Sequence, residues 1–120
     1  MEQNNIYKIG DPTNEIIFEG KTLTFEYPIS KVLEVSHMLI VLLRVPPKIK
    51  YNRNVFGVSL IEKNIKWQIK FQNLKTLFNE SCPFTNIFIY DNKLRLNNWC
   101  SFALFVNPLT GEVLEELETR

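Results

Sequence analysis

The segment that decides the fold class is NVFGVSLIEKNIKWQIKF, which spans residues 54–71. Its two arms, 55–60 and 65–71, are rich in β-branched and aromatic residues, and a short polar loop separates them. Two sets of side chains alternate along the second arm, Ile65, Trp67 and Ile69 with Lys66, Gln68 and Lys70. A period of two is typical of a strand with one buried face. We therefore predict a β-hairpin in which the apolar set faces the core.

Turn signals bound further short apolar segments on both sides of this hairpin. The expected strands are 16–18, 23–27, 31–35, 38–45, 84–90, 93–97, 101–106 and 112–117, the last of which can also be read as a short helix. A helical turn is possible at 73–78. This spacing predicts a mainly β fold, an antiparallel sandwich or half-barrel of about 8–10 short strands with little helix. With no repeat or composition shift, residues 1–120 are expected to form a single domain.

Three connections have the composition of tight turns. Ser36-His37 separates two of the expected strands, and Asp91-Asn92 fits a type I′ hairpin turn, because Asp and Asn tolerate a positive φ. The sequence Asn107–Gly111 fits a type I turn that ends in a glycine bulge.

The composition indicates a folded, soluble protein, with 45% hydrophobic and 22% charged residues in a chain of 120. The beginning of the chain lacks the pattern of a secretory signal. The longest apolar run, 38–43, is far shorter than the ~20 residues of a membrane span. We therefore expect a cytoplasmic location and no membrane association.

No motif for catalysis, metal binding or cofactor binding is present. Cys82 and Cys100 lack the spacing of a zinc or redox site, so they are expected to be buried thiols, although a disulfide stays open. Ser36-His37 has no marked third group to complete a catalytic triad. Glu115 and Glu116 lie in a charged tail rather than in an apolar strand. The chain is therefore not expected to be an enzyme or to hold a cofactor.

Charge is distributed unevenly along the chain. Residues 1–43 and 76–120 each carry a net charge of −3, whereas 44–75 carry eight basic residues against Glu62 alone, a net charge of +7. Aromatic residues within this basic segment make a nucleic-acid-binding surface the alternative function. Trp67 is in phase with the core positions, however, so nucleic acid is the less favoured partner.

Two segments resemble known proteins. Residues 54–71 are similar to a hairpin of a quinoprotein-type propeller blade, and residues 85–115, TNIFIYDNKLRLNNWCSFALFVNPLTGEVLE, resemble its continuation. A single unit cannot close a propeller. Small bacterial proteins with this combination resemble the immunity proteins of toxin–immunity pairs, including those of contact-dependent growth inhibition. The resemblance covers roughly residues 54–117. It implies a cytosolic protein that binds a cognate toxin domain and blocks its active site.

For such an inhibitor, outward-facing polar side chains are the candidate partner-binding residues. They are Lys66, Gln68 and Lys70 on one strand, Lys93, Arg95 and Asn97 on another, and Glu112, Glu115, Glu116 and Glu118 in the acidic tail. An acidic patch would suit a toxin with a basic active site, and the lysine-rich strands would suit an acidic toxin.

Overall fold

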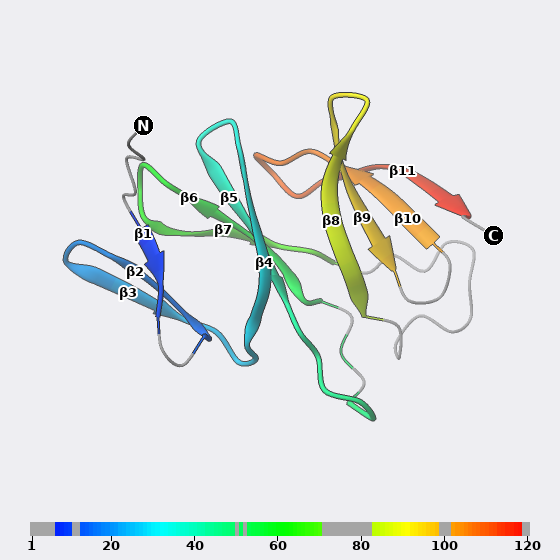
Figure 1. Cartoon of the computed structure of the whole chain (residues 1–120). Coiled ribbons are helices and arrows are strands. Elements are labelled where there is room, and N and C mark those ends of the chain that lie inside the picture. Colours follow the sequence, from blue (N-terminus) through cyan, green and yellow to red (C-terminus); the bar gives the residue numbers. More distant parts are fainter. Residues whose placement is uncertain are drawn as a thin grey trace.

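The structure is a computed structural model that describes residues 7–10, 13–49, 51, 53–70, 83–98 and 102–118. Within these residues the chain forms eleven β-strands and no helix, which confirms the mainly β prediction. Consecutive strands pair antiparallel to build three sheets (Figure 1). Sheet A contains β1 (Tyr7–Ile9), β2 (Glu15–Phe18) and β3 (Lys21–Thr24); sheet B contains β4 (Ile29–Val35), β5 (Met38–Leu43), β6 (Val55–Ser59) and β7 (Asn64–Gln68); sheet C contains β8 (Phe84–Tyr90), β9 (Lys93–Asn98), β10 (Phe102–Val106) and β11 (Val113–Glu118).

Strand β5 lies at the centre of the protein, and every residue in it is buried. Successive side chains of a strand point to opposite faces. One set packs toward sheet C and the other toward sheet A, namely Met38, Ile40 and Leu42 against Leu39, Val41 and Leu43. The unbroken apolar sequence of β5 is therefore explained by a sheet that is covered on both faces.

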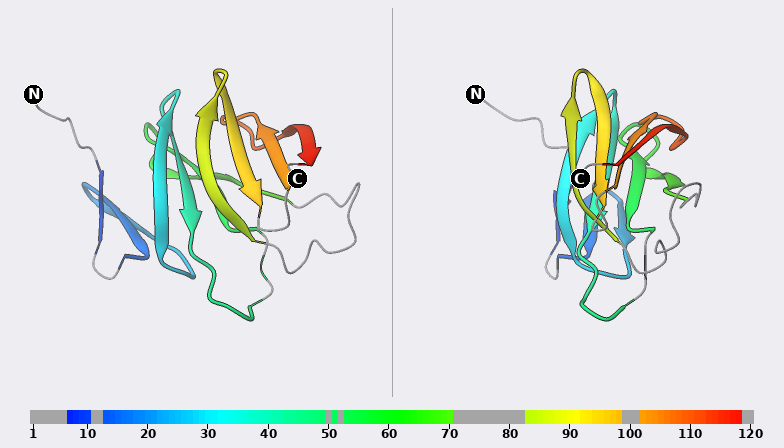
Figure 2. Two further views of the ribbon diagram at one scale, coloured as in Figure 1. Left: turned by 45° about the vertical axis from the view of Figure 1, so that its right-hand side comes forward. Right: turned by 90° about the vertical axis from the view of Figure 1, so that its right-hand side faces the viewer.

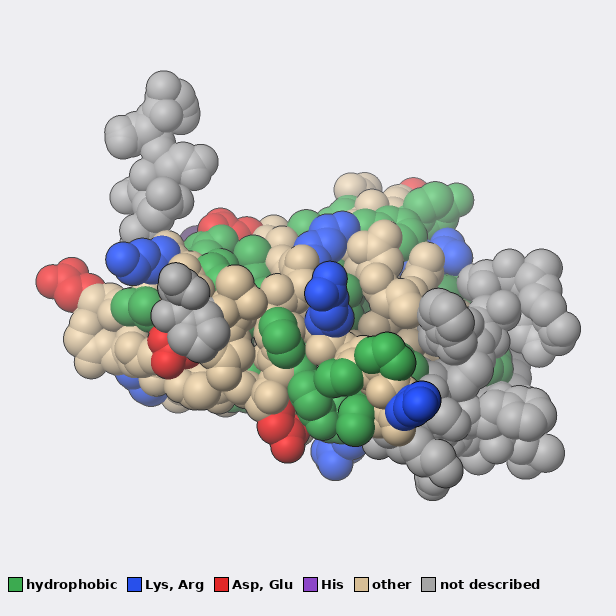
Figure 3. All heavy atoms as spheres, turned by 60° about the horizontal axis from the view of Figure 1, so that its bottom comes forward, with side chains coloured by type: hydrophobic (Ala, Val, Ile, Leu, Met, Phe, Trp, Pro, Cys, Tyr) green, Lys and Arg blue, Asp and Glu red, His purple; other side chains and the backbone are tan. Residues whose placement is uncertain are grey.

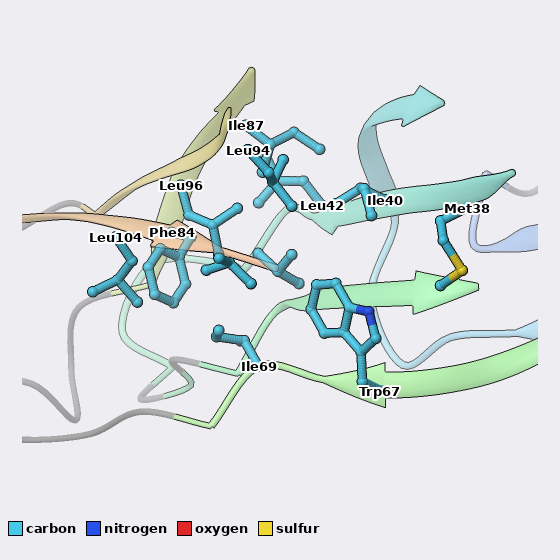
Figure 4. Close-up of a cluster of buried hydrophobic side chains, with 12 residues drawn as sticks. Met38, Ile40, Leu42, Trp67, Ile69, Phe84, Ile87, Leu94, Leu96 and Leu104 are labelled. Atoms are coloured by element: carbon cyan, nitrogen blue, oxygen red, sulfur yellow. The ribbon is translucent and has the colours of Figure 1, made fainter. Parts of the chain in front are cut away.

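The main core lies between sheets B and C. Figure 4 shows side chains from both sheets pointing into this space, with Leu42 of β5 beside Leu94 of β9. Trp67 and Ile69 approach from the β7 side, and Leu104 of β10 lies at the other end. A second cluster fills the space between sheets A and B. These two clusters make sheet B the middle layer of the protein.

The indole of Trp67 lies against the backbone of two glycines. A Cβ atom at Gly57 would overlap the indole nitrogen, and one at Gly111 would lie 2.6 Å from Cδ2. The indole Nε1 donates a hydrogen bond to the carbonyl oxygen of Pro108 at 2.8 Å. Since Gly111 and Pro108 belong to the turn between β10 and β11, Trp67 joins the β7 edge of sheet B to sheet C.

A buried asparagine makes a second connection between these sheets. Asn54 has no solvent exposure. Its side-chain Nδ2 donates to the carbonyl oxygens of Leu43 and Phe84, both at 2.9 Å, and its Oδ1 accepts from the Phe84 amide at 3.0 Å. The side chain therefore fixes the start of β8 against the end of β5.

At the edge opposite β7, sheets B and C meet along β4, β5 and β8 (Figures 1 and 2). Lys31 Nζ on β4 donates to Asn86 Oδ1 on β8 at 3.1 Å. The two sheets thus approach each other at both edges and enclose one core. This is the sandwich that the strand pattern predicted.

The predicted turns are present. Both residues of Ser36-His37 have a positive φ, 52° and 64°, and so do both residues of Asp91-Asn92, at 55° and 63°. Positive φ at both central positions defines the type I′ turn, which suits the twist of a hairpin. Gly111, with φ 78°, donates its amide to the Asn107 carbonyl at 2.8 Å, as expected for a bulge that closes the turn.

One core prediction is wrong, because Ile65 is 41% exposed. Trp67 pairs with Gly57 and Ile65 pairs with Val58, so Lys66 is an additional residue between two consecutive pairs of the ladder. This β-bulge interrupts the period of two. As a result Ile65 no longer shares the buried face of Trp67, and the exposed side of β7 includes both Ile65 and Lys66.

Further differences from the sequence predictions are small. Strand β1 was not expected, because three residues are too few to show an alternating pattern. Residues 113–118 form a strand rather than a helix. The helical turn proposed at 73–78 and the two cysteines, Cys82 and Cys100, lie outside the described residues.

Candidate functional site

Most of the predicted partner-binding residues fall on two separate surfaces. The first is a groove of about 570 Å³ between β7 of sheet B and the residues that lead into β11 of sheet C. Lys66, Gln68 and Lys70 line one side, and Glu112 lines the other. Both β7 and β11 are edge strands of their sheets. The fold therefore brings basic and acidic candidates together at an open edge of the sandwich, which we call the β7–β11 groove.

Two of the polar side chains in this groove already have partners within the protein. Lys66 Nζ forms an exposed ion pair with Glu62 Oε1 at 2.6 Å. Gln68 Nε2 donates to the Tyr51 hydroxyl at 3.0 Å and to the Arg53 carbonyl oxygen at 2.8 Å. Gln68 thereby fastens the segment before β6 to β7. Because Glu62 compensates the charge of Lys66, the groove presents fewer unpaired polar groups to a binding partner than the sequence suggested.

The second surface is the outer face of sheet C, opposite the face that carries the core residues of β9. Directly opposed residues of antiparallel strands lie on the same face. Phe88 opposes Arg95, Arg95 opposes Phe105, and Phe105 opposes Glu115. These pairs form one row of side chains across β8, β9, β10 and β11.

The guanidinium of Arg95 lies among three aromatic rings. Its Cζ atom is 5.4 Å from the ring centroid of Tyr90, 5.7 Å from that of Phe88 and 5.9 Å from that of Phe105. Its Nε donates to Asn97 Oδ1 at 3.0 Å. A cation–π contact of this length contributes about 0.5–1 kcal/mol at an exposed site. Together these contacts hold in place a long side chain that would otherwise sample many rotamers.

Tyr90 and Lys93 complete this group. Tyr90 is 54% exposed, and its ring stacks on that of Phe105 with the two centroids 6.4 Å apart. Lys93 Nζ is 5.3 Å from the centroid of the same Phe105 ring. Among the described residues, neither Lys93 nor Arg95 forms an ion pair with a carboxylate. We call Phe88, Tyr90, Lys93, Arg95 and Phe105 the Arg95 cluster.

The acidic residues near the end of the chain do not form one patch. Glu115 is exposed on the outer face of sheet C, whereas Glu116 opposes Leu104, whose side chain belongs to the core. Oε1 of Glu116 is buried and accepts no hydrogen bond from the described residues. Glu112 belongs to the β7–β11 groove, and the side chain of Glu118 is outside the described structure. Strand alternation thus divides the acidic tail between different surfaces.

Sequence reasoning found Lys93, Arg95 and Asn97 but missed the aromatic residues around them. The segments 84–90 and 102–106 are apolar on both faces, so their pattern does not show which residues point outward. A usable signal was nevertheless present. The two-residue turn Asp91-Asn92 fixes the register of its hairpin, and this register places Phe88 opposite Arg95.

The basic segment 44–75 was the alternative binding surface. On the face shown in Figure 3, the described Lys and Arg side chains stand apart, separated by neutral and hydrophobic side chains. Trp67, one of the aromatic residues of this segment, is buried. Within the described ranges, no group of three or more His, Cys, Asp and Glu residues could hold a metal ion. In the same part of the chain, no helix is long and apolar enough to cross a membrane.

Comparison with known proteins gives one match. The model of a protein family described as a domain of unknown function, DUF7957, matches residues 7–117. The matched region begins with β1 and reaches into β11, so it includes all three sheets. Neither a curated protein nor a solved structure matches the chain.

Proposed function

The chain belongs to the DUF7957 family, and we propose that it is a toxin-neutralising protein that binds a bacterial toxin domain and covers its active site. The observation that carries this proposal is the Arg95 cluster on the outer face of sheet C. Tyr and Arg are enriched among the few residues that dominate the free energy of protein–protein binding. Here both types lie next to each other on one exposed surface.

The position of the cluster suits an inhibitor. Its residues lie on strands whose opposite face packs into the main core, through Leu94 and Leu96 on β9. A surface held this way loses little conformational entropy on binding, because its side chains are ordered before the partner arrives. An inhibitor of this kind acts by occupying the toxin and needs no reaction of its own. The toxin as partner is supported by the resemblance of residues 54–117 to immunity proteins.

The test is co-expression of this protein with the product of the adjacent gene. We expect that product to be toxic alone, harmless with the wild-type protein, and recovered with it in a complex. Tyr90→Ala should weaken the complex by roughly 30-fold or more, as expected for a residue worth about 2 kcal/mol at an interface. Leu114→Ala, which removes an exposed side chain from β11, the opposite edge strand of sheet C, is the control and should bind normally. An adjacent product that is neither toxic nor bound would contradict the proposal.

Nucleic-acid binding through segment 44–75 is the alternative. The pairing of Lys66 with Glu62 and the burial of Trp67 count against it. Phosphate contacts release counterions, so such binding would be strongest at low salt. A mobility shift of DNA or RNA at low salt that is lost on Lys70→Ala would favour this alternative over the toxin proposal.

A further inference from the structure

We propose that the Arg95 cluster binds a carboxylate, so that an Asp or Glu side chain of the protein partner docks on the Arg95 guanidinium. This inference rests on the proposed function. It adds the chemical group that the partner must present and the residue that receives it.

The guanidinium of Arg95 is prepared for such a group. Arginine presents its N–H groups in a planar fork that matches the two oxygens of a carboxylate. The hydrogen bond to Asn97 and the rings of Phe88, Tyr90 and Phe105 fix the guanidinium on the surface of the sheet. No carboxylate among the described residues pairs with it. A charged group is therefore held in one place without a charged partner from the described part of the chain.

The aromatic surroundings strengthen this interaction. Phe105 is 7% exposed and Phe88 is partly buried, so a ligand that reaches Arg95 is shielded from water on the sheet side. Charge-assisted hydrogen bonds are stronger where the local dielectric constant is low. Tyr90, the most exposed ring of the cluster, can cover the bound carboxylate from the side. At the centre of a protein interface, the residues that dominate binding are usually surrounded by contacts that exclude water.

The surrounding charges favour a single carboxylate over the phosphates of a nucleic acid. Glu115 lies two strands from Arg95 in the same row, and Asp91 follows Tyr90 in the hairpin turn. These two acids balance the charges of Lys93 and Arg95. A nucleic acid carries a negative charge at every nucleotide and would approach Glu115 and Asp91 as well, whereas one acidic side chain contacts Arg95 alone.

The test compares two arginine-to-lysine substitutions by isothermal titration calorimetry with the purified toxin domain from the adjacent gene. Arg95→Lys keeps the charge but removes the planar fork, and we expect it to weaken binding at least tenfold. Arg44→Lys makes the same change at an exposed site that follows β5 and should leave binding unchanged. Thermal unfolding of each free variant must match the wild-type protein, which confirms that only the interface has changed.

A charge-reversal experiment identifies the partner group. Arg95→Glu should abolish binding, and an Asp→Arg or Glu→Arg substitution at one exposed position of the toxin domain should restore it. If the Arg95→Lys and Arg95→Glu variants both bind the toxin domain with wild-type affinity, the carboxylate inference is overturned and the proposed function is left intact. A toxin domain that does not bind the wild-type protein would instead refute the proposed function. A mobility shift of RNA or DNA at low salt that depends on Arg95 would show that the cluster binds phosphate. That result would also overturn the inference.

Discussion

Replacement of Gly57 by alanine tests the contact that closes the sandwich between β7 and sheet C. An added Cβ atom would overlap Nε1 and Cε2 of the Trp67 indole. Gly57 is not among the residues with positive φ, so the change acts through packing rather than through backbone strain. The indole must move to make room, and its hydrogen bond to the Pro108 carbonyl at 2.8 Å then breaks.

The loss of stability has two parts. Overpacking of a well-packed core costs about 1–3 kcal/mol. An indole N–H that stays buried without its acceptor costs about 1–3 kcal/mol more. The expected decrease in the free energy of unfolding is therefore about 2–6 kcal/mol, a large part of the roughly 5–15 kcal/mol of a typical domain. At a urea dependence of about 2 kcal/mol per molar, the unfolding midpoint should fall by about 1–3 M.

Urea unfolding followed by far-ultraviolet circular dichroism measures this change. Gly20→Ala is the matched control, because Gly20 has φ 84° but no atom within 4 Å of an added Cβ. That control should lose only about 1–2 kcal/mol, the cost of a left-handed backbone at alanine. Gly111→Ala, with both a positive φ and a close contact to Trp67, should lose more than the control. A Gly57→Ala protein that is as stable as Gly20→Ala would refute the packing of Trp67 on Gly57.

Three further predictions concern the core and the pH dependence of stability. Asn54→Ala should lower the free energy of unfolding in urea by about 2–4 kcal/mol, because backbone groups of β5 and β8 lose their buried hydrogen-bond partner; a loss below 1 kcal/mol would contradict that network. Leu39→Ala should cost about 2–5 kcal/mol in the same assay, and Leu114→Ala, at a 58% exposed position, should stay within about 0.5 kcal/mol of the wild-type protein. The pKa of Tyr51 is raised above its ordinary value of 10.0, mainly by burial and to a smaller extent by the carboxylate of Glu26. The folded protein then holds this proton more tightly than the unfolded chain, so the contribution of Tyr51 is complete below pH 10 and is lost as the pH rises further. Stability of the wild-type protein should therefore fall more steeply above pH 10 than that of Tyr51→Phe, and identical slopes would show that Tyr51 titrates alike in both states.

Features that depend on a few neighbouring residues were predictable from the sequence, whereas features that depend on pairing between strands were not. The hairpin turn Asp91-Asn92 was found in the sequence because a positive φ at two adjacent positions selects particular residue types. The turn Ser36-His37 was placed as the break between two expected strands, 31–35 and 38–45. Ile65 was misplaced, since the bulge at Lys66 depends on how β7 pairs with β6 and leaves no mark in the alternating pattern.

The candidate site likewise depends on contacts between residues of separate strands, which the sequence pattern does not show. Its cationic members, Lys93 and Arg95, were identified from their outward phase on β9. The aromatic rings that hold Arg95 come from β8 and β10, two strands that are apolar on both faces. Lys66, Gln68 and Lys70 were equally good candidates by sequence, but Lys66 pairs with Glu62 and Gln68 with Tyr51. Whether a polar side chain is available depends on the neighbours that the folded chain places beside it.

The sequence by itself determined that the protein is built from short antiparallel strands, where those strands turn, and that Trp67 is buried. These properties follow from side-chain alternation and from backbone preferences within a few residues. Only the tertiary structure decided that β5 is covered on both faces, that the acidic tail is divided between different surfaces, and that Arg95 lies among three rings. The physical reason is that strand register and sheet packing bring together side chains from separate hairpins, and their contacts depend on the whole fold rather than on any single segment.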